Sequence, residues 1–255
     1  MLILISPAKT MTDKSSVKVS SSTNPRFLKE AKEIFLNMAQ FPSEELKRVL
    51  RINSKLAAEN YFRFQQFFST DYLSLQALLA YTGIVFKYIN PKDFSEADMI
   101  FAQEHLRIAS FGYGLLRPLD LIKPYRIEHD VKLPELGDGN MYTYWKPKQT
   151  QTLIKDVKAA GSQLIYLASM DVQPAFDWSQ VEKSVQVITP DFKVWKNGKL
   201  QTIVIYAKMA RGQMSRFIIK NKIQNPEELK SFSWEGFTYD ESQSTPNNWT
   251  FIQKG

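Results

Sequence analysis

The stretch FAQEHLRIASFGYGLLRPLDLIKPYRIE, residues 101–128, organises the rest of the chain. Its first part has apolar residues at helical spacing, which predicts a helix that carries Phe101, His105 and Ile108. Ser95, followed three residues later by Asp98, predicts a capping box at the start of that helix. The stretch therefore begins with a well-marked helix.

A tight turn, Gly112-Tyr113-Gly114, follows this helix. A helix, a Gly-apolar-Gly turn and a second helix make a helix-hairpin-helix, whose backbone N–H groups can contact a phosphate. The other interpretation is an ordinary connection between a helix and a loop. Spacing alone favours that connection, because Pro118 and Pro124 interrupt the segment that would form the second helix.

The end of the stretch is polar. Arg117, Tyr125 and Arg126 are candidates for anion binding, because a guanidinium group matches phosphate or carboxylate geometry. Arg117 and Arg126 can equally form ion pairs with Asp120 and Glu128. Glu128 is also the one candidate for a general acid or base. We expect no metal site here, because the side chains of adjacent residues diverge.

Working outward, Leu2–Ile5 is a short apolar run that predicts a buried strand. Ser6-Pro7-Ala8-Lys9 follows it, and a polar loop after a buried strand is a favoured place for ligand contacts. Ser6 supplies a hydroxyl and Lys9 a mobile cation. A plain turn at the end of the strand is the alternative.

On the other side lies KMARGQMSRFII, residues 208–219. We expect Lys208 and Arg211 at a junction between a strand and a helix that begins at Gln213, where the helix N-terminus favours an anion. Ser215 and Arg216 are further candidates for anion binding. The alternative is a solvated basic start of a helix.

The remaining patterns predict alternating helices and strands. Asn197-Gly198 predicts a hairpin between the strand-like segments 185–195 and 200–207. Residues 163–167 and 84–86 also have strand patterns, and residues 234–239 and 249–252 are possible closing strands. No linker forces a boundary, so we expect residues 1–255 to form a single mixed α/β (α+β) domain with a mixed sheet, surrounding helices and a basic cleft.

Composition excludes several classes of protein. The chain of 255 residues has no cysteine and two histidines, which removes disulfides, thiolate chemistry and multi-histidine metal sites. Neither a signal peptide nor a membrane-spanning helix is expected, and we predict a cytoplasmic protein. We also expect a monomer without a cofactor.

The net charge of +7 is concentrated in one segment. Residues 192–230 contain nine basic and two acidic residues, which by themselves give this net charge. Such a concentration favours an anionic partner, and nucleic acid is the leading candidate. An ordinary solvated basic surface remains the alternative.

Three segments taken together resemble the YaaA family of bacterial peroxide-stress proteins. They are LISPAKT at residues 4–10, LRPLDLIKPYRIE at 116–128 and ARGQMSRFII at 210–219. The resemblance implies an α/β protein with a positively charged cleft and a helix-hairpin-helix. It also implies binding of double-stranded or branched DNA, and limits on free iron and oxidative DNA damage under peroxide stress. The sequence departs from the family pattern at residues 82–86, 111–112 and 170–172.

The family positions carried over to this sequence are Ser6, Lys9, Arg117, Asp120, Tyr125, Arg126, Lys208, Arg211 and Arg216. Two hypotheses follow. The first is a DNA-binding stress protein whose cleft grips phosphates, with Gly112 and Gly114 in the hairpin. The second is an enzyme for a nucleotide or similar small anion, with a pocket lined by Ser6, Lys9, Arg126 and Glu128. Whether the protein is an enzyme stays open at this point.

Overall fold

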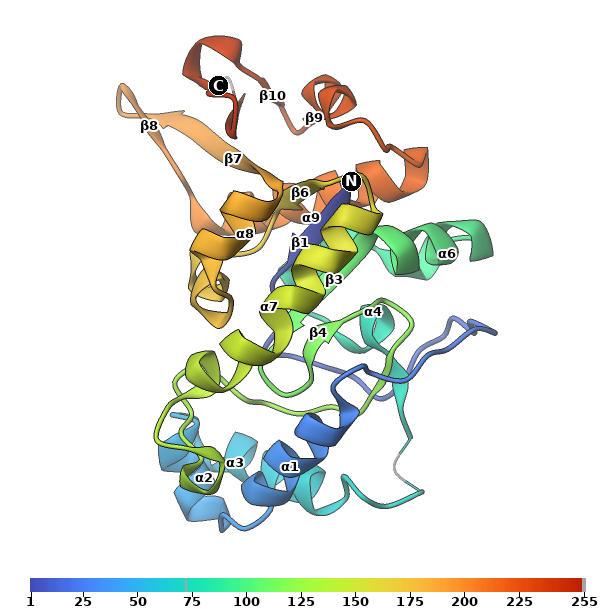
Figure 1. The fold of residues 1–255 in the computed structure, drawn as a ribbon, viewed down its shortest axis with the longest axis vertical. Coiled ribbons are helices and arrows are strands. Elements are labelled where there is room, and N and C mark those ends of the chain that lie inside the picture. The colour runs from blue at the N-terminus through green and yellow to red at the C-terminus, as the bar shows by residue number, and fades with distance from the viewer. Residues whose placement is uncertain (72, 254–255) are drawn as a thin grey trace.

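The computed structural model describes residues 1–71 and 73–253, which form a single α/β domain around a mixed nine-stranded sheet (Figure 1). The strand order is β4-β3-β1-β6-β7-β11-β10-β9, with β8 paired to β7. The strands are β1 (Leu2–Ile5), β3 (Leu106–Ser110), β4 (Gly114–Leu116), β6 (Gln163–Tyr166), β7 (Gln186–Lys196), β8 (Lys199–Gln201), β9 (Ser233–Trp234), β10 (Phe237–Tyr239) and β11 (Asn248–Gln253). A second, two-stranded sheet pairs β2 (Leu75–Gln76) with β5 (Leu121–Ile122). These findings confirm the predicted fold class.

The centre of the large sheet is parallel. Strand β1 pairs in parallel with β3 on one side and with β6 on the other, and β7 continues the parallel order to β11. All four residues of β1 are buried, as expected for a strand covered on both faces. Because the chain leaves β1 toward β3 and later returns to β6, the strand order reverses beside β1. In open α/β sheets, ligands bind outside the carboxyl ends of the strands at such a point.

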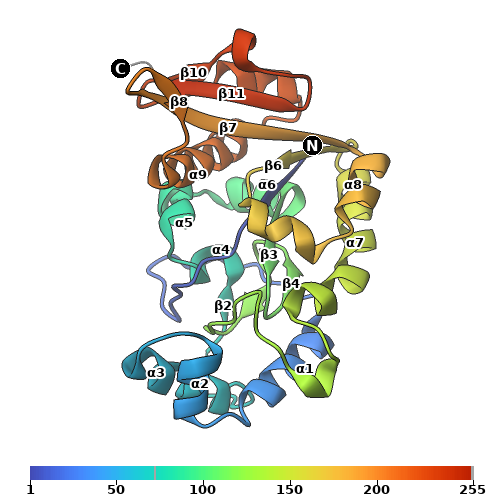
Figure 2. The same cartoon turned by 90° about the vertical axis from the view of Figure 1, so that its left-hand side faces the viewer.

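Helices cover the sheet and extend beyond it (Figure 2). They are α1 (Leu28–Met38), α2 (Ser43–Val49), α3 (Ser54–Gln65), α4 (Ala77–Ala80), α5 (Ile84–Ile89), α6 (Glu96–His105), α7 (Met141–Ala159), α8 (Trp178–Ser184) and α9 (Val204–Asn221). Short 3₁₀ segments are η1 (Pro91–Asp93), η2 (Pro134–Leu136), η3 (Met170–Ala175), η4 (Pro226–Ser231) and η5 (Glu241–Gln243). Helices α1 to α3 gather at one end of the molecule, and β9 to β11 lie at the other (Figure 2). No helix in the described part of the chain has the length and apolar character needed to span a membrane.

The predicted helix-hairpin-helix is wrong. Helix α6 begins with the expected Ser95–Asp98 capping box but ends at His105, and Leu106–Ser110 form β3. The Gly112-Tyr113-Gly114 turn therefore joins two antiparallel strands. All five residues of β3 are buried, and the spacing of its apolar residues Leu106 and Ile108 fits a buried strand beside β1 as well as the end of an amphipathic helix.

Packing explains both glycines of this turn. A Cβ atom on Gly112 would lie 2.7 Å from the ring of Tyr125, and one on Gly114 would lie 2.6 Å from the ring of Trp145. Gly114 also has a φ of +70°, which favours glycine. Both glycines are buried against these rings, which leaves a phosphate no access to their backbone.

Two other boundaries differ from the sequence analysis. Residues 84–86, expected as a strand, begin α5, and strand β8 ends at Gln201, so that Val204 already begins α9. Lys208 and Arg211 consequently lie within a helix, and the predicted anion site at a helix N-terminus is wrong. A Cβ atom on Gly212 would lie 2.4 Å from the carbonyl oxygen of Val85, so glycine is what lets α9 approach α5 closely.

Candidate functional site

A cavity of about 680 Å³ opens beyond the carboxyl ends of β1 and β6, and we call it the central pocket. Its wall comes from residues 6–10 after β1, 167–172 after β6, the start of α5 at 83–86, the segment 125–129 and one face of α9. Backbone hydrogen bonds from Thr12 to Ala80 and from Thr82 to Thr10 fasten the loop after β1 to the segment before α5. Five segments far apart in sequence therefore meet at the point where the strand order reverses.

Seven of the predicted site residues line the central pocket. They are Ser6, Lys9, Tyr125, Arg126, Glu128, Lys208 and Arg211. The pocket thus contains four cationic side chains, and two carboxylates, Glu128 and Asp171, face them. This mixed charge distinguishes the pocket from a uniformly basic surface.

Glu128 lies between two cations. Its Oε1 atom is 3.0 Å from Lys9 Nζ and 3.4 Å from an Nη atom of Arg126. The contact with Arg126 is longer than a good charge-assisted hydrogen bond, and Arg126 Nε has no hydrogen-bond partner among the described residues. Glu128 therefore holds both cations near the pocket without saturating Arg126.

Arg211 is the least compensated charge in the pocket. Its side chain is largely buried within α9, and its Nε atom has no hydrogen-bond partner in the described part of the chain. Burial lowers the pKa of Arg211, although Tyr166 and Asp191 oppose this. Within residues 1–71 and 73–253 no carboxylate reaches ion-pair distance of either Arg211 or the exposed Lys208.

Polar contacts fix the two strand-end loops. Ser6 Oγ accepts a hydrogen bond of 2.8 Å from the backbone N–H of Ser169. The hydroxyl of Tyr166 donates to the carbonyl oxygen of Ser169 at 2.5 Å, and that of Tyr142 donates to the carbonyl oxygen of Asp171 at 2.6 Å. Ser6 therefore joins the two loops, and its hydroxyl oxygen already has a protein partner.

A buried hydroxyl cluster supports the segment that carries Arg126. The Tyr125 hydroxyl lies 2.7 Å from the Tyr81 hydroxyl and 2.5 Å from Ser110 Oγ. Burial raises the pKa of both tyrosines, so both hydroxyls keep their protons at neutral pH. The cluster ties Tyr125 to the end of β3 and thereby fixes the backbone beside Arg126.

Other predicted residues lie outside the pocket and have protein partners. Arg117 donates to the fully buried carboxylate of Asp120 at 2.9 Å and 3.2 Å. Arg216 donates to both carboxylate oxygens of Asp93 at 2.7 Å. The buried Ser215 hydroxyl donates to the carbonyl oxygen of Arg211 at 2.9 Å. Together with Gly112 and Gly114, these residues hold the fold together.

Sequence reasoning missed the apolar part of the wall. Ile84, Met170 and Val204 line the central pocket although their side chains are 37%, 61% and 63% exposed. Each is the first residue of a helical segment, α5, η3 or α9. The position of residue 170 just after a buried strand was the available signal, whereas the other two were assigned to strands.

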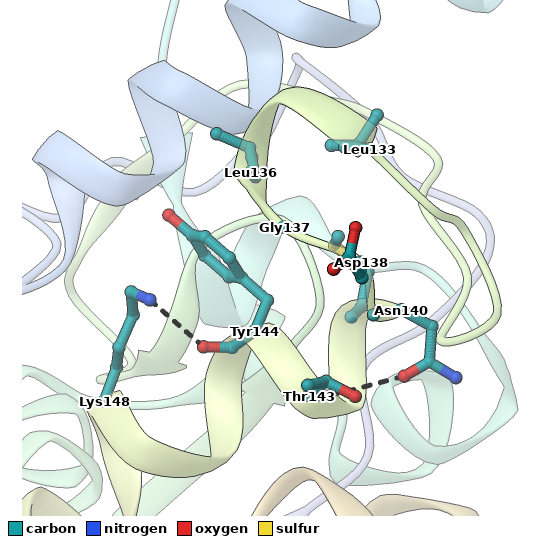
Figure 3. A pocket seen from close by; sticks show the side chains of 10 residues that line it. Leu133, Leu136, Gly137, Asp138, Asn140, Thr143, Tyr144 and Lys148 are labelled. Carbon is teal, nitrogen blue, oxygen red and sulfur yellow. Dashed lines mark hydrogen bonds between the residues drawn. The ribbon is translucent and has the colours of Figure 1, made fainter.

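A second hollow is much smaller (Figure 3). It measures about 130 Å³ and lies between residues 133–139 and the start of α7. Figure 3 shows Lys148 beside Tyr144, and Lys148 Nζ lies 3.9 Å from the centre of that ring. Polar groups of this hollow form hydrogen bonds within the protein. Asn140 Oδ1, for example, accepts hydrogen bonds from the backbone N–H groups of Tyr142 and Thr143.

Metal-binding chemistry has little support at either hollow. Among the described residues, no three histidine or carboxylate side chains are grouped as they would be around a metal ion.

Comparison with known proteins identifies the family. The sequence profile described as "Peroxide stress protein YaaA" matches residues 1–243. The chain belongs to the peroxide stress protein YaaA family. Relatives with similar sequences include a "UPF0246 protein" of Parabacteroides distasonis, 62% identical over the whole of both chains. Another, from Bacteroides thetaiotaomicron, is 58% identical over 99% of this chain and 98% of its own. A "UPF0246 protein" of Porphyromonas gingivalis is 42% identical over the whole of both chains.

Proposed function

We propose that the protein acts in peroxide-stress defence by binding a small phosphate-bearing anion in the central pocket. Membership of the peroxide stress protein YaaA family supports the role in peroxide stress. The observation that carries the proposed binding is Arg211, a largely buried cation that lines the pocket without a carboxylate partner among the described residues. A buried charge needs a partner, and an anionic ligand supplies one.

The dimensions of the pocket favour a small ligand over a duplex. A volume of about 680 Å³ falls within the usual range for small-molecule sites, about 300 to 1,000 Å³. A duplex would need an exposed row of cations, whereas Arg117 and Arg216 are already paired with carboxylates. This geometry supports the second of the two hypotheses more than the first.

Calorimetric titration with inorganic phosphate tests the proposal. The wild-type protein should bind it, and Arg211→Met should weaken binding at least about tenfold, since hydrogen bonds to charged groups contribute about 1.5 to 3 kcal/mol. Arg48→Met, which removes an exposed arginine from α2 outside the pocket, serves as the control. Unchanged affinity in Arg211→Met would contradict the proposal.

The role in stress is tested in cells that lack the protein. Wild type and Arg48→Met should restore survival in hydrogen peroxide, and Arg211→Met should not. Turnover of nucleotides by Glu128→Gln tests the catalytic role that the sequence suggests for Glu128. Its contacts with Lys9 and Arg126 favour a positioning role, in which case this variant keeps any turnover but binds anions more weakly.

DNA binding is a second candidate, and it is favoured by the β7–β8 hairpin. Lys196 and Lys199 flank the exposed Asn197-Gly198 tip, and Trp195 beside them is 54% exposed. Exposed cations with an aromatic ring are a common combination for gripping phosphates and stacking bases. On this proposal, protection of DNA accounts for peroxide resistance, and any effect on free iron is indirect.

Gel-shift titration with duplex and branched DNA tests this candidate. Binding should weaken steeply as salt rises, and Lys196→Gln/Lys199→Gln should reduce the salt dependence. Lys55→Gln/Lys158→Gln removes two exposed lysines elsewhere and is the matched control. Absence of a shift at low salt would exclude DNA binding by the hairpin.

A further inference from the structure

The central pocket has two chemically different parts. One part contains the cations and carboxylates described above, and the other consists of apolar side chains. One face of α9 joins the parts, because Val204, Ala207, Lys208 and Arg211 recur at helical spacing and all line the pocket. A ligand lying along α9 would therefore meet an apolar residue at one end and two cations further along the helix.

The apolar part of the pocket consists of exposed side chains that gather at one cavity. Ile84, Met170 and Val204 come from three different elements and line the same cavity with exposed side chains. Exposed apolar side chains that gather at a cavity commonly mark a binding site. A bare phosphate would leave this part uncovered, whereas a flat heterocyclic base would cover it.

The charges in the pocket limit the size of the anion. Glu128 compensates part of the charge of Lys9 and Arg126, whereas Lys208 and Arg211 have no carboxylate partner among the described residues. Two cations match one phosphate monoester, which carries about −1.5 to −2 charges at neutral pH. A triphosphate would add charge that these two residues cannot balance, and Asp171 would repel it.

Asp171 is placed to accept hydrogen bonds from a sugar that joins a base to a phosphate. It lines the pocket, and no lysine or arginine among the described residues pairs with it. Its carboxylate accepts a hydrogen bond from Ser169 Oγ at 3.1 Å and has further acceptor capacity. An acidic residue in the crevice beyond a parallel strand commonly accepts hydrogen bonds from ribose hydroxyls.

We propose that the central pocket binds a nucleoside monophosphate. Its phosphate lies between Lys208 and Arg211, its ribose faces Asp171, and its base packs on Ile84, Met170 and Val204. This inference rests on the proposed function, because it names the class of phosphate-bearing ligand. The same chemistry occurs in a free nucleotide and at the phosphorylated end of a nucleic-acid strand, and the free nucleotide is favoured because the volume is that of a small-molecule site.

Calorimetric titration of the full chain tests the proposal with AMP, adenosine, ATP, inorganic phosphate and a 5′-phosphorylated oligonucleotide. AMP should bind at least about tenfold more tightly than phosphate or adenosine, because neither half of the ligand alone satisfies both parts of the pocket. It should also bind at least about tenfold more tightly than ATP, because Asp171 repels the added charge of the triphosphate. Phosphate binding as tight as that of AMP would overturn the nucleotide inference and leave the proposed function standing. Absence of binding by any phosphate compound would overturn both. Tighter binding of the oligonucleotide than of AMP would assign the pocket to a strand end and overturn the free nucleotide.

Substitutions at two neighbouring residues test whether the apolar part of the pocket contributes to AMP binding. Val204→Ser should weaken AMP about fivefold and leave phosphate unchanged, because it removes apolar contact surface. Ile205→Ser changes an equally apolar, 46% exposed residue that does not line the pocket, and it should change neither affinity. Equal effects of the two substitutions on AMP would contradict the placement of the base.

Discussion

The two halves of α9 both carry basic residues but differ in their electrostatic environments. In the C-terminal half, Arg216 pairs with Asp93, while Lys220 and the capping residue Lys222 both pair with Asp98. In the N-terminal half, Lys208 and Arg211 have no carboxylate partner among the described residues. The comparison teaches that a concentration of positive charge becomes a binding site only where the fold leaves it uncompensated.

The largest expected effect concerns the C-terminal half of α9, which we call the compensated half because its cations pair with carboxylates; the N-terminal half is the uncompensated half. Asp98→Ala removes the partner of two lysines and one side of the capping box at the start of α6. We expect it to lower the free energy of unfolding by about 3 kcal/mol, because it removes charge-assisted hydrogen bonds from two lysines together with the capping contact at the start of α6. Urea unfolding measures this loss, and Asp138→Ala, an exposed carboxylate at the small hollow, is the control. A loss no larger than that of the control would mean that this half is not held by its ion pairs.

The next effect concerns the uncompensated half. Arg211→Met should reduce the affinity for AMP by about 30-fold, equivalent to about 2 kcal/mol. The free energy of unfolding should stay within about 0.5 kcal/mol of wild type or rise, because the substitution replaces an unpaired buried charge by an apolar side chain. A large loss of stability would show that Arg211 has a structural role like that of Arg216.

Arg216→Met should lower the free energy of unfolding and leave the affinity for AMP unchanged, the reverse of Arg211→Met. It loses two hydrogen bonds to Asp93 and those to the carbonyl oxygens of Ile89 and Asn90. Stability should fall by about 1 to 2 kcal/mol, less than for a fully buried pair because Asp93 is half exposed. Affinity for AMP should not change. Chemical denaturation and calorimetry on the same preparation measure both quantities.

Acid should weaken the compensated half first. Although burial acts to raise it, hydrogen bonds from Lys222 and Lys220 hold the pKa of Asp98 well below its usual value of 3.8. A carboxylate with a lowered folded-state pKa stabilises the fold above its unfolded-state pKa and loses that contribution as pH falls through the folded-state pKa. Stability should therefore decline below about pH 4 in wild type, and less steeply in Asp98→Asn, as circular dichroism during acid titration can show.

The smallest expected effect is at Lys208. Its side chain is exposed, so its interaction with a phosphate is screened by water and salt. Lys208→Met should weaken AMP binding about threefold, equivalent to about 0.7 kcal/mol, and higher ionic strength should reduce the difference. A loss as large as that of Arg211→Met would move the main anion contact toward the surface.

Much of the fold could be predicted from local patterns. The buried run in β1, the Asn197-Gly198 hairpin and the Ser95–Asp98 capping box are each specified within a few residues, and all three are confirmed. β3 was mistaken for part of a helix because its apolar residues Leu106 and Ile108 fit either structure until β1 lies beside it. A pattern read within one segment contains no information about the neighbouring strand.

Only part of the candidate site could be predicted from the sequence. Ser6 and Lys9 follow from the rule that ligands bind beyond strand ends, and both line the pocket. Arg211 and Arg216, five residues apart, could not be distinguished, because the partner of Arg216 is Asp93, 123 residues away in sequence. The apolar wall at Ile84 and Val204 was hidden by the assignment of both to strands.

Thermal unfolding of wild type, Arg211→Met and Arg216→Met, each with and without AMP, tests the central claim most directly. A ligand that binds the folded state raises the unfolding temperature, and at a fixed ligand concentration the increase is larger for tighter binding. The account predicts that wild type and Arg216→Met gain the same increase with AMP, from a lower starting temperature in Arg216→Met, and that Arg211→Met gains almost none. A full increase in Arg211→Met, or its loss in Arg216→Met, would contradict the assignment of the binding site to the uncompensated half of α9.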